Sequence, residues 1–149
     1  MRVFKETQRF NQTWIIVLIA VSTLVPVAII INDFQNNPNS LSTMEFLLIL
    51  TLLLILPCLI FFLKLSTKID ESGIYYKFFP IHLQYKKINW NDIKSAYVRT
   101  YDAISEYGGY GLKGGFFWRK SKGVAINVSG DIGLQLELKN GKKLLIGTQ

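Results

Sequence analysis

The chain has 149 residues, half of them hydrophobic, and a formal net charge of +7 at pH 7. This length favours one domain with appendages, and the positive mean hydropathy is high for a soluble protein of this size. Cys58 is the lone cysteine and His82 the lone histidine in the sequence. A disulfide framework, a cysteine–histidine metal cluster and a histidine-based catalytic site therefore each lack the members that they need.

Two uncharged, apolar stretches, residues 14–31 and 46–63, dominate the first half of the chain. At about 1.5 Å of rise per residue, each would reach roughly 27 Å as a helix, which is close to the hydrocarbon thickness of a bilayer. Pro26 and Pro57 lie inside these stretches, and transmembrane helices tolerate proline. We therefore predict that residues 1–65 comprise an N-terminal tail and a transmembrane hairpin.

Cations lie at the two outer ends of this predicted hairpin and are absent from its connecting loop. The connecting loop, residues 32–43, contains no lysine or arginine. The cations lie before the first stretch and after the second, at Arg2, Lys5, Arg9, Lys64 and Lys68. The positive-inside rule then places both termini in the cytoplasm and predicts a multi-pass protein of the inner (cytoplasmic) membrane.

The composition changes after the second stretch. Residues 66–149 carry thirteen Lys or Arg residues against seven Asp or Glu residues. Almost no linker precedes this segment, so we expect it to lie at the membrane surface. Its basic charge suits an anionic leaflet, but it is also what topology alone would require of a cytoplasmic segment.

Strand patterns follow in chain order through residues 66–149. Residues 67–70 and 74–80 predict a hairpin with Gly73 in its turn. Residues 82–88 alternate less cleanly, residues 88–101 fit either a strand or a short helix, and residues 123–130 predict a short strand bounded by glycines.

The clearest pattern lies close to the C-terminus. Leu134 and Leu136 share one face of a strand, with polar residues on the other face. A three-residue loop at residues 139–141 would pair Leu136 with Leu144 and Leu134 with Ile146, which matches the apolar faces. We therefore predict a mainly-β cytoplasmic domain, 66–149, built as a small antiparallel sandwich or open barrel.

Three segments of this domain, residues 69–80, 88–98 and 127–149, resemble bacterial membrane proteins in which a pleckstrin-homology-like (PH-like) domain follows two transmembrane helices. The resemblance implies a seven-stranded, strongly bent sheet closed by a C-terminal helix, and no enzymatic activity. The chain stops at Gln149, where that helix would begin, so we expect the closing helix to be absent. Few cations lie in the first hairpin, so recognition of inositol lipids is not implied.

A glycine-rich stretch interrupts the domain. Gly109, Gly111 and Gly114 have the G-x-G-x-x-G spacing of a dinucleotide site, but no helix pattern follows them. We therefore expect a long loop or irregular hairpin and no cofactor. The aromatic and cationic residues after the glycines suit a membrane–water interface, unless Phe116 or Trp118 packs in the sheet core. The predicted interface residues are Phe116, Phe117, Trp118, Arg119, Lys120 and Lys122.

The patterns together favour a non-enzymatic, membrane-anchored binding or scaffold module. Its expected partners are anionic lipid headgroups and an unidentified protein or a second copy of the chain. The tether to the membrane argues against nucleic acid as a partner. The alternative is a small accessory subunit of a larger membrane complex, with its helices as the working surface.

Overall fold

The computed structural model describes residues 3–37, 40–114 and 123–149 of the chain. The chain divides into two compact units. Asn11–Phe62 form the helical unit, while Met1–Phe10 and Leu63–Gln149 together form the β-rich unit.

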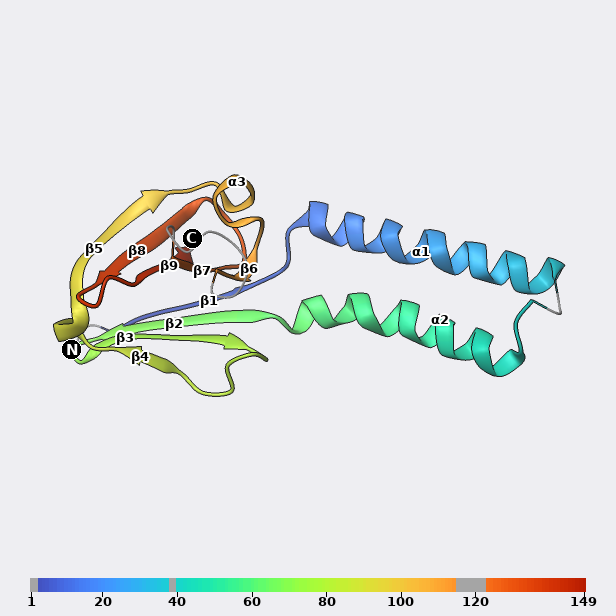
Figure 1. Ribbon diagram of the computed structural model, residues 1–149, viewed down its shortest axis with the longest axis horizontal. Coiled ribbons are helices and arrows are strands. Elements are labelled where there is room, and N and C mark those ends of the chain that lie inside the picture. Colours follow the sequence, from blue (N-terminus) through green and yellow to red (C-terminus); the bar gives the residue numbers. More distant parts are fainter. Residues whose placement is uncertain (1–2, 38–39, 115–122) are drawn as a thin grey trace. The chain divides into compact units, whose positions relative to one another are not determined.

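The helical unit contains two apolar helices (Figure 1). Helix α1 spans Thr13–Asn36, and helix α2 spans Thr43–Cys58 and continues as the 3-10 helix η1, Leu59–Phe62. Both helices are long and apolar enough to cross a membrane. The predicted pair of apolar helices is therefore confirmed.

Both helices extend into the predicted loop. Helix α1 continues past residue 31 because polar side chains bond within it, as where Asn36 Nδ2 donates to the Asn32 carbonyl at 2.9 Å. Helix α2 begins before residue 46 because Ser42 and Glu45 form a capping box. The Ser42 N–H donates to Glu45 Oε2 at 2.9 Å, and the Glu45 N–H donates to Ser42 Oγ at 3.3 Å.

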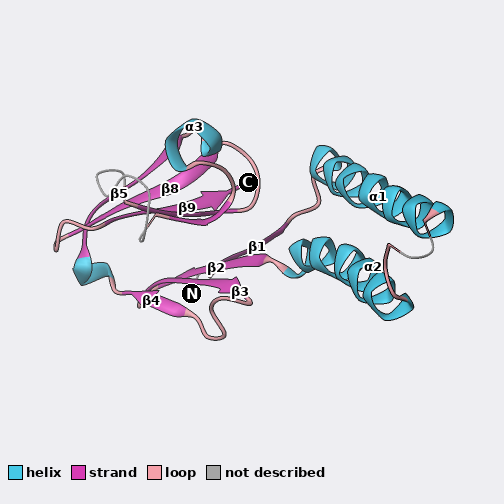
Figure 2. Cartoon of the chain, turned by 45° about the vertical axis from the view of Figure 1, so that its right-hand side comes forward, coloured by secondary structure: helices cyan, strands magenta, loops and turns pink. Residues whose placement is uncertain are grey.

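The β-rich unit contains a four-stranded antiparallel sheet (Figure 2). Its strand order is β1-β2-β3-β4, where the strands span Phe4–Arg9, Lys64–Asp70, Gly73–Phe79 and Lys86–Ile88. The predicted hairpin is confirmed as β2 and β3, since Leu65 pairs with Phe78. Gly73 begins β3 opposite Asp70, just after the turn at residues 71–72, and does not lie in the turn itself.

A second sheet of five strands has the order β5-β8-β9-β7-β6. The strands span Ile93–Thr100 (β5), Gly111–Lys113 (β6), Val124–Asn127 (β7), Ile132–Leu138 (β8) and Lys143–Thr148 (β9). Strands β7 and β9 are parallel, so the sheet is mixed rather than antiparallel as predicted. The described strands thus form two separate sheets, without closing into a barrel.

Strand β1 was not predicted. Residues 4–9 lie in the expected N-terminal tail, but they form an edge strand that pairs with β2 from Phe4↔Ile69 to Arg9↔Lys64. The residues before the first apolar helix therefore belong to the β-rich unit. Their alternation is polar on both faces, so the sequence offers no apolar strand signal there.

The hairpin of β8 and β9 has the predicted register. Leu134 pairs with Ile146 and Leu136 with Leu144, with the turn at residues 139–142. Within the ambiguous segment 88–101, a short 3-10 helix η2, Trp90–Asp92, is followed by strand β5.

Apolar side chains of the two sheets meet between them. Leu65, Ile74 and Phe78 of the four-stranded sheet are each 1% exposed. Leu136 and Ile146 share the apolar face of the five-stranded sheet and are equally buried. Each such side chain contributes about 1.5–3 kcal/mol when it leaves water. This burial defines the inner face of each sheet.

A short helix, α3, spans Ala103–Tyr107 and covers part of the other face of the five-stranded sheet. Ala103 and Tyr107 pack with Tyr101 against Ala125 and Leu145. These last two residues have the strand parity opposite to the inner-face residues. The β-rich unit therefore contains a second, smaller apolar cluster.

Candidate functional site

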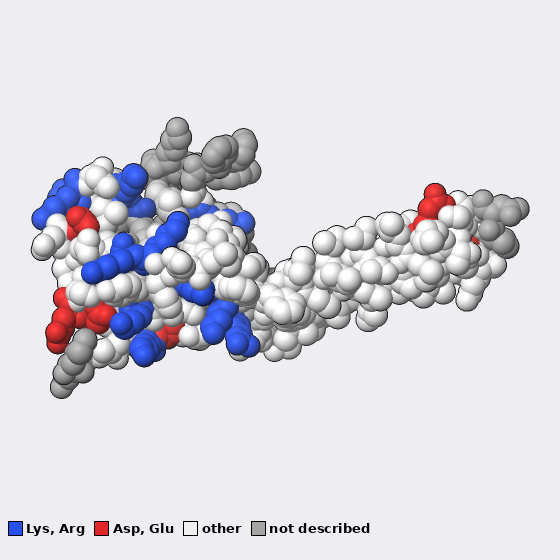
Figure 3. All heavy atoms as spheres, turned by 90° about the horizontal axis from the view of Figure 1, so that it is seen from below, with Lys and Arg blue, Asp and Glu red and all other residues white. Residues whose placement is uncertain are grey.

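The outer face of the four-stranded sheet is strongly basic. The register of the four strands places alternate residues on this face, opposite to the buried Leu65, Ile74 and Phe78. We call it the basic face, and its cations are Lys5, Arg9, Lys64, Lys68, Lys77 and Lys87. Figure 3 shows Lys and Arg side chains spread over this side of the β-rich unit.

Cations lie directly opposite one another on neighbouring strands. Lys5 pairs with Lys68, and Arg9 pairs with Lys64. Like charges in directly opposed positions destabilise a sheet. Folding of the β-rich unit therefore concentrates positive charge at a cost, and a bound anion would remove that cost.

Two aromatic rings lie among these cations. The ammonium groups of Lys68 and Lys87 are 5.1 Å and 5.6 Å from the centroid of the Tyr75 ring. Lys77 Nζ is 5.8 Å from the centroid of the Phe79 ring. Cation–π contacts of this length hold an ammonium group without neutralising it. The charges on the basic face consequently stay available to an external anion.

Asp70 is the acidic residue that shares this face within the described ranges. Its side chain is 6% exposed, and Oδ2 lies 2.7 Å from Lys68 Nζ. Oδ1 accepts hydrogen bonds from the Ser72 hydroxyl at 2.6 Å and the Ser72 N–H at 2.9 Å. Hydrogen bonds from Lys68 and then Ser72 lower the pKa of Asp70 well below its usual value. Asp70 is therefore ionised and engaged, and it offsets one of the six cations.

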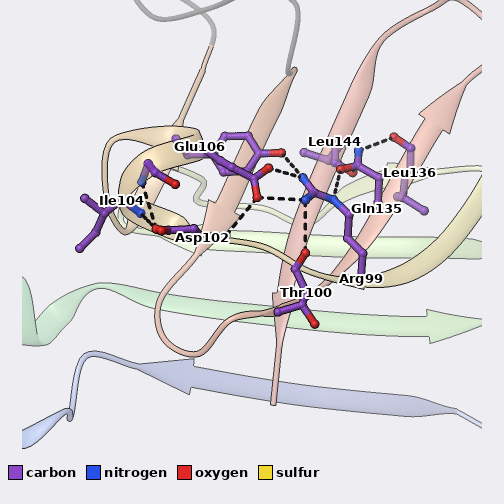
Figure 4. Close-up of polar contacts among 10 residues, drawn as sticks. Arg99, Thr100, Asp102, Ile104, Glu106, Gln135, Leu136 and Leu144 are labelled. Carbon is purple, nitrogen blue, oxygen red and sulfur yellow. Dashed lines mark hydrogen bonds and ion pairs between the residues drawn. The ribbon is translucent and has the colours of Figure 1, made fainter.

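Arg99 is the centre of a polar network on the five-stranded sheet (Figure 4). Its guanidinium donates to both carboxylate oxygens of Glu106, at 3.2 Å and 2.9 Å, and to the Tyr107 hydroxyl at 3.0 Å. Its Nε donates to Gln135 Oε1 at 3.2 Å. The hydrogen bond to Glu106 raises the pKa of Arg99. This bidentate arrangement holds α3 on the sheet, so we interpret it as structural.

His82 occupies a buried position just after β3. Its backbone N–H donates to the Phe78 carbonyl at 2.7 Å, and its Nδ1 accepts from the Phe78 N–H at 3.3 Å. Its ring meets the Tyr76 ring edge-on, with 5.9 Å between centroids. His82 is therefore held against β3 by its backbone and by its ring.

The sequence-predicted membrane interface lies outside the described residues. Phe116, Phe117, Trp118, Arg119, Lys120 and Lys122 all fall between Gly114 and Gly123. On either side of them, β6 and β7 pair antiparallel. This antiparallel pairing agrees with the hairpin alternative of the expected loop and differs from the parallel crossover of a dinucleotide site.

The spacing of four cations in the sequence is a signal for the basic face. Lys64 and Lys68, like Lys5 and Arg9, are separated by three residues, so each pair shares one side of an extended strand. These cations also satisfy the positive-inside rule, which accounts for them without a strand at residues 4–9. Only the pairing of β1 with β2 places Lys5 opposite Lys68 and Arg9 opposite Lys64, and the sequence does not predict that pairing.

Comparison with known protein families, curated proteins and solved structures finds no match to this chain. The described part of the chain also contains no group of three or more His, Cys, Asp or Glu side chains placed to hold a metal ion.

Proposed function

We propose that this chain is a non-enzymatic binding module anchored in the cytoplasmic membrane of a bacterium. In this proposal α1 and α2 span the bilayer, both termini face the cytoplasm, and the β-rich unit is a PH-like domain. Its basic face binds the anionic lipid headgroups of the leaflet. The bacterial and PH-like assignments rest on the sequence resemblance, and the two facing sheets are compatible with them.

One observation carries the proposal: opposed cations on one sheet face, as in Lys5 with Lys68 and Arg9 with Lys64. A cation near an anionic leaflet is worth about 1 kcal/mol, so the five that Asp70 does not offset provide on the order of 5 kcal/mol at low salt. This energy is too small to recruit a free protein firmly. It suffices for a unit that the helices already hold at high effective concentration.

Energy transfer in proteoliposomes tests this proposal. The full chain carries Cys58→Ser and a donor dye on Thr7→Cys, an exposed position on the basic face. Acceptors are attached to lipid headgroups, and the vesicles contain phosphatidylcholine alone or with phosphatidylglycerol. We expect stronger transfer with phosphatidylglycerol, and a decrease as salt rises.

Charge-reversal variants separate the basic face from net charge. Lys5→Glu with Lys87→Glu should abolish the dependence on phosphatidylglycerol. Lys94→Glu with Lys139→Glu changes the net charge equally but alters exposed residues elsewhere, in β5 and in the β8–β9 turn. This matched pair should retain the dependence. Equal transfer in both lipid mixtures, or equal effects of both pairs, would refute the proposal.

A second function, the small accessory subunit, is favoured by an apolar groove in the helical unit. The groove has a volume of about 320 Å³ and is lined by Ser22 of α1 and by Leu52, Leu56 and Pro57 of α2. A transmembrane helix of a partner is the natural occupant of such a groove. When this chain is purified in mild detergent, a partner membrane protein should then co-purify in stoichiometric amount. Leu52→Trp should release that partner because the larger side chain fills the groove.

A further inference from the structure

A cleft opens between the inner faces of the two sheets, at the side of the β-rich unit where β4 lies. We call it the inter-sheet cleft, and its volume is about 330 Å³. Strand β4 pairs with only three residues of β3, Ile74 to Tyr76. The four-stranded sheet therefore covers its partner incompletely there, and the inward-facing Leu112 and Val124 remain only half-buried.

The wall of the inter-sheet cleft is apolar and comes from both sheets. The apolar lining residues are Ile88, Leu112, Val124, Ile126, Leu138 and Leu144. Ile88 belongs to the four-stranded sheet, and the other five belong to the five-stranded sheet. Moving an apolar chain from water onto such a wall is favourable, because it removes apolar surface from water.

The polar groups of the cleft are hydrogen-bond donors or cations. They are Tyr76, His82, Lys86, Lys142 and Lys143. Lys143 already pairs with Glu137, with Nζ 3.2 Å from Oε1. Among the described residues that line the cleft there is no aspartate or glutamate. An anionic group would therefore meet complementary charge on this side of the cleft.

Two neutral donors reinforce the cations. His82 Nδ1 accepts from the Phe78 N–H, so the proton of the neutral imidazole is on Nε2. Burial, and then the charge of Lys86, lower the pKa of His82, which favours that neutral form. Burial raises the pKa of Tyr76, so its hydroxyl keeps its proton. Both side chains can donate to an anion without carrying charge.

We propose that the inter-sheet cleft binds a fatty acid, with its chain along the apolar wall and its carboxylate against Tyr76, His82, Lys86 and Lys142. The volume lies at the lower end of the roughly 300–1,000 Å³ that ligand pockets occupy. It therefore suits one acyl chain and not the two chains of a phospholipid. This proposal does not rest on the basic face, because Lys86 and Lys87 are neighbours on β4 with opposite orientations.

Photolabelling of the full chain in nanodiscs tests the site. The probe is a fatty acid with a diazirine at its terminal carbon, and labelled peptides are mapped by mass spectrometry. We expect label in the described cleft strands, around Ile126 and Leu144, in addition to label in the helices. Unlabelled fatty acids should compete, with affinity rising about fourfold per added methylene until the cleft is full. Zwitterionic lysophosphatidylcholine should compete poorly.

A matched pair of lysines separates this site from the basic face. Lys86→Glu should weaken competition about tenfold, because it places a negative charge at the carboxylate. Lys87→Glu should leave competition unchanged while it weakens headgroup contact. Val124→Phe should block labelling by filling the cleft. If Val124→Phe prevents folding, the Lys86→Glu variant still tests the site, because Lys86 is exposed. Label confined to residues 13–62, or equal effects of Lys86→Glu and Lys87→Glu, would overturn the proposal.

Discussion

Asp70 shows how one side chain sets the charge of the basic face. Its carboxylate binds Lys68 and Ser72, and its backbone carbonyl accepts from the Trp90 indole N–H at 3.0 Å. The hydrogen bond to Asp70 also raises the pKa of Lys68. The two residues therefore stay charged together across the physiological range, and no acid within the described ranges forms an ion pair with the other cations of the face.

The lowered pKa of Asp70 predicts a specific pH dependence of stability. A group whose pKa is lower in the folded state stabilises that state fully above its unfolded pKa, about 3.9 for aspartate. The stabilisation disappears as the pH falls from there toward the folded pKa. Thermal unfolding of the full chain in detergent should show a smaller acid-induced decrease for Asp70→Asn than for the parent, with lower stability at neutral pH.

Ser72→Ala provides the control for this prediction. It removes the hydroxyl donor but keeps the backbone N–H of residue 72 and the contact with Lys68. Its pH dependence should fall between those of the parent and Asp70→Asn. Identical acid profiles for all three chains would contradict the assignment of the lowered pKa to these hydrogen bonds.

At the scale of the element, the β2–β3 hairpin depends on the close approach of β4. Gly73 has a φ of +152° and pairs with Asp70. A Cβ at Gly73 would collide with the carbonyl oxygen of Ile88, the last residue of β4. Only glycine lets these two backbones lie this close.

We predict that Gly73→Ala destabilises the β-rich unit by about 3 kcal/mol or more, since backbone strain adds to a clash with fixed backbone. Gly141→Ala is the matched control, because Gly141 also has a positive φ, +80°, but no atom within 4 Å of the added Cβ. It should cost only about 1–2 kcal/mol. Chemical denaturation monitored by circular dichroism measures both. Equal losses would contradict the collision.

Local pattern and long-range pairing differ in how far the sequence predicts them. The register of β8 and β9 was predictable because apolar alternation and the Asn140–Gly141 turn constrain the same few pairings. The parallel pairing of β7 with β9 leaves no local trace. Helix α3 was missed because its five residues depend on the Asp102 cap and on contacts with Arg99. The basic face could not be predicted because strand β1, which supplies Lys5 and Arg9, leaves no apolar pattern in the sequence.

At the scale of the whole molecule, the helical unit is an insertion between two neighbouring strands of one sheet. The chain leaves the β-rich unit after β1 and returns to it at β2, and the flanking residues Arg9 and Lys64 are register partners. The N-terminal strand also holds the C-terminal residues. Glu6 accepts from the Thr148 hydroxyl at 2.7 Å and from the Gln149 N–H at 2.8 Å. Gln8 Nε2 donates to the Gly147 carbonyl at 3.1 Å.

These contacts predict which part of the chain folds without a membrane. A chain in which a short Asn-Gly-containing turn replaces residues 11–62 should form a continuous β1–β2 hairpin, because its ends are already adjacent. We expect a soluble monomer with one cooperative thermal transition, measured by light scattering and circular dichroism.

A fragment of residues 67–149 should instead self-associate. It lacks β1, exposes the edge of a shortened β2, and loses the bonds that Glu6 and Gln8 make to β9. Glu6→Ala in the turn-containing chain should lower its melting temperature but leave it monomeric. If the fragment folds as well as the turn-containing chain, β1 is dispensable and the two sheets are held together by their inner faces alone.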